Sequence, residues 1–332
     1  MPVDDRLGEY IASALLPSLG HAGLPFSLEV PPASGTRTTI TLLRAAGMPP
    51  LLLRQFKHRS QAVRNCQALR HLESLGLPAP RLVSHDLSRA ARILGGRGRA
   101  PFTTAETWIE GQRVSSLAGP ARRAALTRVA ELLARFREVR RSRWGRPARG
   151  SLLPYASVTL FDARRMAGAI LRRGWLDGDE SARLIDRLRL WSGVLHGLGP
   201  FSLLHKDANP DNFILRASGD VVPVDLHRLA YGPFPEELVT ALHHFCPLDP
   251  SEADLFLEAY FTRGAESAAA TFHASRPFFE CLYFLKKLAA RSRRTRVGRS
   301  DEKVQRWRRL VLALGPPASA GPRGGAESGP LT

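Results

Sequence analysis

Cysteine is scarce in this sequence, and we find neither a membrane-spanning run nor the pattern of a secretory signal in it. The three cysteines of the 332 residues, Cys66, Cys246 and Cys281, are far apart and odd in number. This excludes a disulfide framework or a cysteine-rich zinc module and favours a reducing compartment. No apolar run approaches the roughly 18 residues of a membrane-spanning helix. Residues 1–5 lack the basic-then-apolar order of a secretory signal, so we expect a cytoplasmic protein.

Lysine is also scarce, although the chain is strongly basic. Only five of the 48 basic residues are lysine, against 30 acidic residues, and the formal net charge is +18. An arginine bias of this kind fits the coding bias of a GC-rich genome, but such a charge also attracts phosphates, nucleic acid or an anionic membrane surface. Both explanations stay open. The hydrophobic content of 44% is enough for a core and excludes a wholly disordered chain.

The first third of the chain predicts a small lobe rich in β-strands. Apolar residues at helical spacing predict a helix within residues 1–21. Short β-prone runs separated by turn residues then predict a lobe over residues 22–110. The expected strands are 26–30, 38–43, 51–56, 81–86 and 103–109, with one helix that contains Ala62, Cys66, Leu69, Leu72 and Leu75 and ends at Gly76.

The rest of the chain predicts a larger, mainly helical lobe over residues 111–314. Its one non-helical island covers residues 201–232. From Gly315 the composition of proline, glycine, alanine and serine predicts a disordered tail, 315–332. The expected helices are 119–139, 162–173, 178–196, 236–246, 251–262, 275–291 and 301–313.

The island holds the polar residues to which we assign chemistry. A loop with His205, Asp207 and Asn212 follows one apolar run, and Asp225 lies near the end of another. Phosphoryl transfer from a nucleotide needs a carboxylate to accept the proton of the attacking hydroxyl and two oxygen ligands for Mg²⁺. The spacing His-x-Asp-x₄-Asn…Asp meets this need. We therefore assign Asp207 as the base, Asn212 and Asp225 as metal ligands, and His205 as a brace of the loop.

With these residues the sequence resembles the protein-kinase-like phosphotransferases, especially their small-molecule branches. The string Val-Asp-Leu-His-Arg at 224–228 is similar to the lipopolysaccharide core (Kdo/heptose) kinases. The run Phe-Leu-Glu-Ala-Tyr at 256–260 is closer to the aminoglycoside and choline phosphotransferases. The resemblance spans roughly residues 25–262. It implies an α+β, two-lobed fold that binds ATP and Mg²⁺ in its cleft and transfers the γ-phosphoryl group to a hydroxyl.

The family's phosphate-gripping pair differs in this chain. The family pairs a strand lysine with a helix glutamate, and the matching positions here hold Arg54 and Asn65. Arg54 keeps a positive charge, and its guanidinium group can bind phosphate through two nitrogens. Lys57, on the opposite face of the strand, is a weaker candidate for the phosphate contact. We expect Arg54 and Asn65 to replace the pair together, so that no carboxylate is left buried and unpaired.

Two further segments are candidates for nucleotide contacts. Ser34, Gly35 and Thr36 lie in the loop 31–37, where backbone amides and hydroxyls could cradle phosphates, although a plain hairpin turn explains this loop equally well. Trp108 and Ile109 resemble the interlobe hinge of the family, whose backbone would bind adenine. The alternative for Trp108 is simple core packing.

The acceptor and the partners are less constrained by the sequence. We expect a small-molecule or glycolipid acceptor, no specific nucleic acid, since no groove-reading motif occurs, and no obligate protein partner. His243, His244 and Cys246 form a poor chelate because neighbouring helical residues point about 100° apart. The basic run of Lys286, Lys287, Arg291, Arg293, Arg294, Arg296 and Arg299 is either a solvated face or a contact for anionic lipid or phosphorylated sugar near the inner membrane face.

Two rivals to the enzyme remain. The loss of the lysine–glutamate pair favours a catalytically impaired pseudokinase that uses the fold as a binding module. The high positive charge favours a nucleic-acid binder, which a steep salt dependence of DNA binding would reveal.

Overall fold

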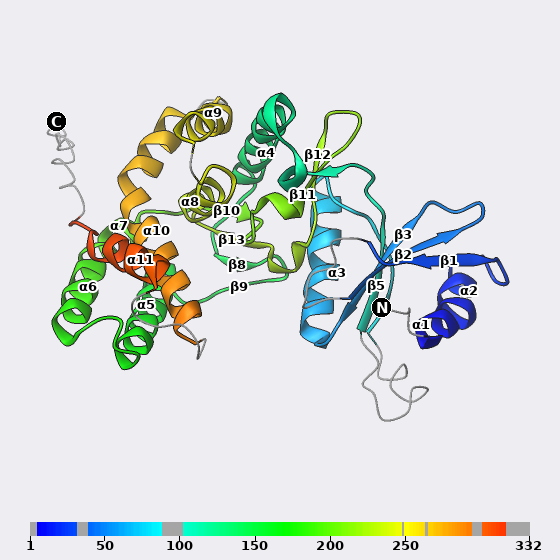
Figure 1. The fold of residues 1–332 in the computed structure, drawn as a ribbon, viewed down its shortest axis with the longest axis horizontal. Coiled ribbons are helices and arrows are strands. Elements are labelled where there is room, and N and C mark those ends of the chain that lie inside the picture. Colours follow the sequence, from blue (N-terminus) through cyan, green and yellow to red (C-terminus); the bar gives the residue numbers. More distant parts are fainter. Residues whose placement is uncertain are drawn as a thin grey trace, which may run out of the picture.

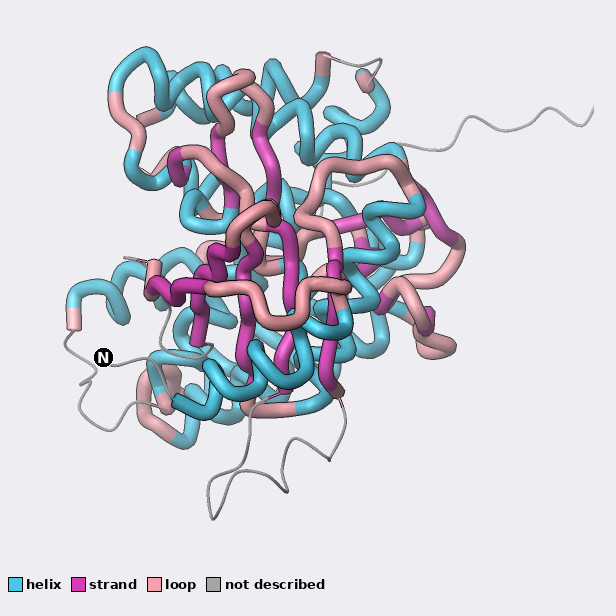
Figure 2. The backbone as a smooth tube through the Cα atoms, turned by 90° about the vertical axis from the view of Figure 1, so that its right-hand side faces the viewer, coloured by secondary structure: helices cyan, strands magenta, loops and turns pink. Residues whose placement is uncertain are grey.

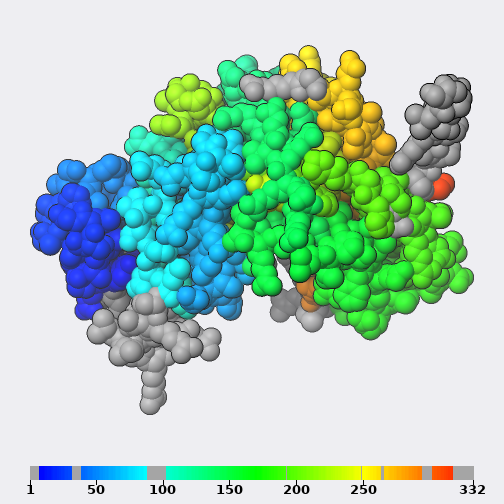
Figure 3. Space-filling view, turned by 180° about the vertical axis from the view of Figure 1, so that it is seen from behind, coloured from blue at the N-terminus to red at the C-terminus, as the bar shows by residue number. Residues whose placement is uncertain are grey.

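A computed structural model shows two lobes joined side by side, which confirms the expected α+β kinase-like architecture (Figure 1). The structure describes residues 5–31, 39–87, 102–247, 249–262, 265–293 and 301–316. Within these residues, no helix combines the length and the apolar character needed to cross a membrane. In the view from behind, the small lobe runs from blue to cyan and the large lobe from green to orange (Figure 3).

A five-stranded antiparallel sheet forms the small lobe, with the strand order β1-β2-β3-β5-β4. Its strands lie side by side in Figure 2, which views the molecule from this lobe. The turn that carries Gly47 joins β2 to β3. The bounds are Phe26–Glu29 for β1, Thr39–Ala45 for β2, Leu51–Phe56 for β3, Leu82–Asp86 for β4 and Phe102–Thr107 for β5.

Helices cover both faces of this sheet. The expected N-terminal helix consists of α1 (Asp5–Tyr10), the π-helix η1 (Ile11–Leu15) and α2 (Leu16–Ser18). Its apolar side chains pack on one face of the sheet, where they bury Leu43, Leu51, Leu53 and Ala105. Helix α3 (Arg59–Ser74) packs against β3, β4 and β5. Because side chains alternate along a strand, Leu52, Arg54 and Phe56 point away from the N-terminal helix, toward α3.

The large lobe is built from helices around one extended apolar core. Two helices begin earlier than the sequence predicts: α5 at Tyr155 rather than residue 162, and α10 at Glu266 rather than residue 275. Helix α10 continues through Pro277, because burial of Phe272, Phe278 and Phe279 outweighs the hydrogen bond that proline removes. The helices are α4 (Gly119–Glu138), α5 (Tyr155–Arg172), α6 (Gly178–Leu190), α7 (Ser192–His196), α8 (Phe234–Phe245), α9 (Pro250–Phe261), α10 (Glu266–Ser292) and α11 (Glu302–Leu312).

Two small sheets form the non-helical island. Strands β11 (Phe213–Leu215) and β12 (Val221–Pro223), which contain apolar residues of the island, make a hairpin, and β6 (Gln112–Arg113) pairs with β11. The second sheet has the order β7-β10-β13-β8-β9. Its strands are β7 (Arg140–Arg141), β8 (Gly145–Arg146), β9 (Arg149–Gly150), β10 (Phe201–Leu204) and β13 (Ala230–Gly232). Strands β7, β8 and β9 were not predicted, because two-residue strands carry no periodicity.

Two close contacts fix the ends of the large lobe. Gly111 has φ of +150°, and a Cβ built on it would lie 2.3 Å from the carbonyl oxygen of Leu215, so only glycine fits where the connecting segment meets β11. At the other end, Gly315 accepts a hydrogen bond from Trp191 Nε1 at 2.9 Å. Gly315 is thus tied to the lobe rather than free, and the remainder of the expected tail, from residue 317, lies outside the described residues.

Candidate active site

The loop after β10 carries the first two predicted residues, His205 and Asp207. His205 is fully buried, and its Nε2–H donates to the carbonyl oxygen of Val224 at 3.0 Å. Burial lowers the pKa of His205, with opposing contributions from Asp207 and Asp225. A neutral, buried imidazole can hold the loop against the strand that leads to Asp225, but it is poorly suited to shuttle protons.

Asn212 ties the loop to itself and to the next strand. Its side-chain Nδ2 donates to the backbone carbonyl of Asp207 at 2.9 Å, and its backbone carbonyl accepts from the N–H of Val224 at 2.8 Å. This leaves the side-chain oxygen of Asn212 available as a ligand. The Asp207 side chain, 28% exposed, lies 3.7 Å from Arg228 Nη1. These contacts hold the loop of Asp207 and Asn212 beside Val224, the residue that precedes Asp225.

Asp225 lies where β12 turns into the short 3₁₀ helix η5 (Leu226–Arg228). Its backbone is left-handed, with φ of 59° and ψ of 53°, which is unfavourable for a residue with a Cβ. Oδ1 accepts from His227 Nδ1 at 2.8 Å and lies 3.7 Å from Arg54 Nη1 of the small lobe. Burial opposes ionisation, but the hydrogen bond from His227 and the charge of Arg54 outweigh it and lower the pKa of Asp225 to about 2.

A buried glutamate that the sequence analysis missed completes the small-lobe side of the site. Glu106 on β5 is 1% exposed, and its Oε2 accepts from Arg54 Nε at 3.2 Å. Its Oε1 accepts from Asn65 Nδ2 on α3 at 2.6 Å and from Thr104 Oγ1 at 3.0 Å. Arg54 and Asn65 therefore leave no buried carboxylate unpaired, but they do bind one that was not predicted, which β5 supplies in place of the glutamate that the family places on the helix.

Strand alternation explains why Glu106 reaches Arg54. In the antiparallel register, Arg54 lies opposite Thr104 and Leu52 opposite Glu106. Glu106 is thus the diagonal neighbour of Arg54 on the same face, within reach of a long side chain. Glu106 is the single acidic residue in the run Phe-Thr-Thr-Ala-Glu-Thr, but its place on the same face as Arg54 follows only from the register between β3 and β5.

The other predicted nucleotide contacts are only partly placed. Trp108 and Ile109 follow β5 and are half-buried, and the N–H of Trp108 donates to Pro50 at 3.0 Å. The Trp108 N–H is therefore already used within the small lobe. Lys57 is exposed just beyond β3. Ser34, Gly35 and Thr36 lie outside the described residues.

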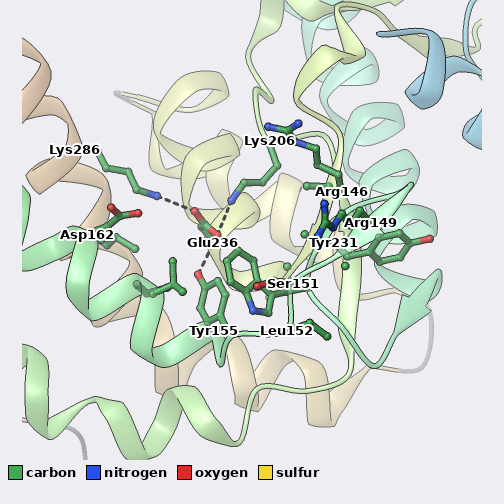
Figure 4. A pocket seen from close by; sticks show the side chains of 18 of the residues that line it. Arg146, Arg149, Ser151, Leu152, Tyr155, Asp162, Lys206, Tyr231, Glu236 and Lys286 are labelled. Atoms are coloured by element: carbon green, nitrogen blue, oxygen red, sulfur yellow. Dashed lines mark hydrogen bonds and ion pairs between the residues drawn. The ribbon is translucent and has the colours of Figure 1, made fainter. Parts of the chain in front are cut away.

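Two adjoining cavities lie near the catalytic loop, and one of them reaches Asp207. One, of about 490 Å³, is lined by Asp207, and the other measures about 840 Å³ (Figure 4). Both are lined by Lys206, Glu236 and Lys286. Glu236 on α8 accepts from Lys206 Nζ at 2.7 Å, Lys286 Nζ at 2.8 Å and Tyr155 Oη at 3.1 Å. Despite burial, the charges of Lys206 and Lys286 lower the pKa of Glu236.

The residues of the basic run after residue 285 lie in different environments. Lys286 and Lys287 line the cavity beside Asp207, whereas Arg291 pairs with Asp301 at 2.7 Å and Arg293 is exposed. The remaining members of the run, from Arg294, lie outside the described residues. Lys286 and Lys287 therefore line a cavity that also reaches Asp207, although Lys286 is exposed to solvent.

The neighbouring histidines on α8 also have separate surroundings. His244 Nδ1–H donates to the carbonyl of Ala208 at 3.0 Å and so supports the loop. His243 stacks on Tyr283, with ring centroids 4.7 Å apart. Over the described part of the chain, no three histidine, cysteine or carboxylate side chains cluster as metal ligands. An amide oxygen and one carboxylate, Asn212 and Asp225, fit a Mg²⁺ ion that takes its other ligands from phosphate and water.

Comparison with known structures shows the same fold. The ADP-bound aminoglycoside phosphotransferase APH(2'')-Ib superposes with a TM-score of 0.61 at 14% identity, over 94% of this chain and 99% of that one. A putative fructosamine-3-kinase from Thermobifida fusca has a TM-score of 0.61 at 15% identity, over 91% and 98%. A choline/ethanolamine kinase family protein from Mesorhizobium loti has a TM-score of 0.58 at 17% identity, over 92% and 94%.

Sequence comparison identifies the family. No curated protein sequence matches the chain. A family model described as the phosphotransferase enzyme family matches residues 30–278, about three quarters of the sequence. Together with the shared fold, this confirms the resemblance to the small-molecule branches of the protein-kinase-like superfamily. The chain belongs to the phosphotransferase enzyme family.

Proposed function

We propose that this protein transfers the γ-phosphoryl group of ATP, with Mg²⁺, to a hydroxyl group of a small molecule or of a glycolipid sugar. The observation that supports the proposal is a short series of contacts: Asn212 Nδ2 donates to the backbone carbonyl of Asp207, the N–H of Val224, next to Asp225, donates to the backbone carbonyl of Asn212, and Arg54 reaches Asp225 from the other lobe. Similar structures contain ADP, or ATP together with streptomycin, which supports a nucleotide site in this fold.

Each residue has a defined task in the proposed reaction. The acceptor oxygen attacks the γ-phosphorus, the bond from that phosphorus to the bridging oxygen of ADP breaks, and Asp207 takes the hydroxyl proton. Arg54, oriented by Glu106, lies where it can steady the phosphates. Asn212 and Asp225 would hold Mg²⁺, which supplies charge neutralisation at the phosphates when bound. The gain in rate then comes mainly from positioning and from electrostatic stabilisation.

The location follows from the substrates. We place the reaction in the cytoplasm, where ATP is available. A glycolipid acceptor, as in the lipopolysaccharide kinases that the 224–228 string resembles, would add contact with the inner membrane face.

Replacement of the proposed base tests the reaction. We expect Asp207→Ala to lower phosphotransfer turnover by about a thousandfold while the melting temperature stays near that of the parent, because only the proton acceptor is removed. The measurement is transfer of labelled phosphate from ATP to a panel of sugars, aminoglycosides, choline-like amines and lipopolysaccharide fragments. Asp211→Ala, an exposed carboxylate in the same loop, is the matched control and should retain parental turnover. Near-parental turnover of Asp207→Ala would show that the base is wrongly assigned.

A nucleotide-binding scaffold without catalysis is the second candidate. It is favoured by one observation, the engagement of Arg54 with both Glu106 and Asp225 in place of the family's lysine. A melting shift with Mg·ATP but no labelled product from any acceptor would select this candidate. The absence of any shift would count against both.

A further inference from the structure

The two cavities near the catalytic loop carry an excess of positive charge. Eight arginine and lysine side chains line them, against four carboxylates. Cavities lined mainly by one sign of charge concentrate ligands of the opposite sign. The eight are Arg64, Arg146, Arg149, Arg165, Lys206, Arg228, Lys286 and Lys287.

The four carboxylates are already engaged. Asp162 pairs with Arg165 at 3.2 Å, and Glu236 is held between two lysines. Glu237 accepts from the backbone N–H of Lys206 at 2.7 Å, and burial raises its pKa to about 7, so it carries only part of a charge near neutrality. Asp207 lies 3.7 Å from Arg228 and is the proposed base. Little negative charge is left over to receive a cationic ligand.

Several of the basic side chains, in contrast, lack a counter-ion. Among the residues that the structure describes, Arg64, Arg146, Arg149 and Lys287 form no ion pair with a carboxylate. Lys287 instead lies over the ring of Tyr283 and contacts His244. Arg64 of the small lobe and Arg146 of β8 face the same cavity, and burial together with the charge of Arg146 lowers the pKa of Arg64. An anion between these two guanidinium groups would relieve their repulsion.

The backbone of the catalytic loop provides a second observation in favour of a functional role for the positive charge of these cavities. Lys206 has φ of 64°, a left-handed conformation that glycine adopts readily and that is unfavourable for residues with a Cβ. The residue in this conformation lies immediately before the proposed base, and it lines both cavities. Strain of this kind persists where the surrounding structure or the function demands it.

We infer that the acceptor of this phosphotransferase carries an anionic phosphate group, which binds to the arginine and lysine side chains around Arg146 while the acceptor's hydroxyl lies at Asp207. This rests on the proposed function and adds the substrate class. Cationic aminoglycosides and choline-like amines are then poor acceptors, although the fold is shared with proteins that are named for them. The phosphate belongs either to a soluble phosphate ester or to a phosphorylated lipid.

Charge reversal of the patch, measured with the nucleotide site filled, tests the inference. With Mg·ADP present, we expect glucose 6-phosphate to raise the melting temperature in a saturable way, whereas glucose and gentamicin do not. In the double variant Arg146→Glu/Arg149→Glu the affinity for glucose 6-phosphate should fall by about tenfold to a hundredfold, because charge-assisted hydrogen bonds are lost. Arg135→Glu, an exposed arginine on α4, is the matched control and should bind as the parent does.

A vesicle arm separates the two sources of phosphate. Cosedimentation with phosphatidylglycerol vesicles but not with phosphatidylcholine vesicles, lost in the double variant and kept in Arg135→Glu, would support the inference with a lipid as the source. The inference is overturned if neither probe depends on Arg146 and Arg149, if gentamicin binds in preference, or if the double variant raises only the KM for ATP. A missing melting shift with Mg·ADP would contradict the proposed function by itself. Glucose 6-phosphate is also titrated without nucleotide, so a failure of the proposed function can be distinguished from a failure of this inference.

Discussion

Among single residues, Glu106 changes the understanding of the site most. It replaces the helix glutamate of related kinases from a neighbouring strand, and it holds a buried arginine in place of a lysine. A guanidinium fixed by Nε to a carboxylate still presents its other nitrogens to a second anion, which an ammonium could do less well. The change from lysine to arginine and the change in the origin of the carboxylate are therefore one coordinated arrangement.

Removal of the Glu106 charge should damage both stability and nucleotide binding. We expect Glu106→Gln to lower the free energy of unfolding by about 3 kcal/mol, because Arg54 loses its buried counter-ion. The KM for ATP should rise as well, since Arg54 is no longer oriented. Urea denaturation and initial-rate kinetics measure the two effects.

The exposed pair Arg44–Glu29 in the same sheet provides the control. Its side chains are 44% and 55% exposed, so Glu29→Gln should cost less than about 0.5 kcal/mol. Equal losses in Glu106→Gln and Glu29→Gln would contradict the role assigned to Glu106.

Among the elements, α8 holds the catalytic loop at two points. Glu237 in its first turn accepts the backbone N–H of Lys206, and His244 in its last turn donates to the carbonyl of Ala208. The loop with Asp207 is therefore fixed from both ends of one rigid helix, which is how a catalytic group keeps its geometry.

The contact of Glu237 makes stability depend on pH. Burial raises the pKa of Glu237 to about 7, above the value of about 4.3 in an unfolded chain. The folded state thus retains a proton that the unfolded chain releases, and the stability from this proton is lost as the pH rises from about 4 through 7. Relative to Glu237→Gln, the parent should lose up to about 3 kcal/mol between about pH 5 and pH 8.

Urea denaturation of both proteins across this range measures the difference. Glu258→Gln, an exposed carboxylate on α9, should follow the parent. Parallel pH curves for the parent and Glu237→Gln would show that Glu237 ionises normally.

The elements also show what the sequence could and could not predict. The small-lobe strands, the N-terminal helix and the β11–β12 hairpin follow from apolar runs and turn residues, and the motif predicts that Asp207, Asn212 and Asp225 belong to one site. Arg146 escaped prediction because β8 and β9 are defined only by pairing with distant segments. Glu106 escaped because its importance depends on the register between β3 and β5, which no local pattern encodes.

For the whole molecule, the net charge of +18 predicts an affinity for nucleic acid that has no sequence preference. Binding of this kind releases counter-ions from the phosphate backbone and weakens steeply with salt. We expect fluorescence anisotropy to detect equal binding of unrelated DNA duplexes at about 50 mM salt and almost none at about 200 mM. A preference for one duplex that persists at the higher salt would revive the nucleic-acid binder as the main function.

Gly111 limits how this molecule can be recombined with its relatives. The segment that leaves the sheet touches β11 at a point where even a methyl group would collide with Leu215, and β6 pairs with β11 directly afterwards. A chimera that exchanges nucleotide-binding halves must therefore cross over before Gly111 and keep that glycine with its own β6–β11 ribbon. A junction placed only a few residues later would combine the connecting segment of one protein with the β11 strand of another, and the close contact at Gly111 would not be preserved.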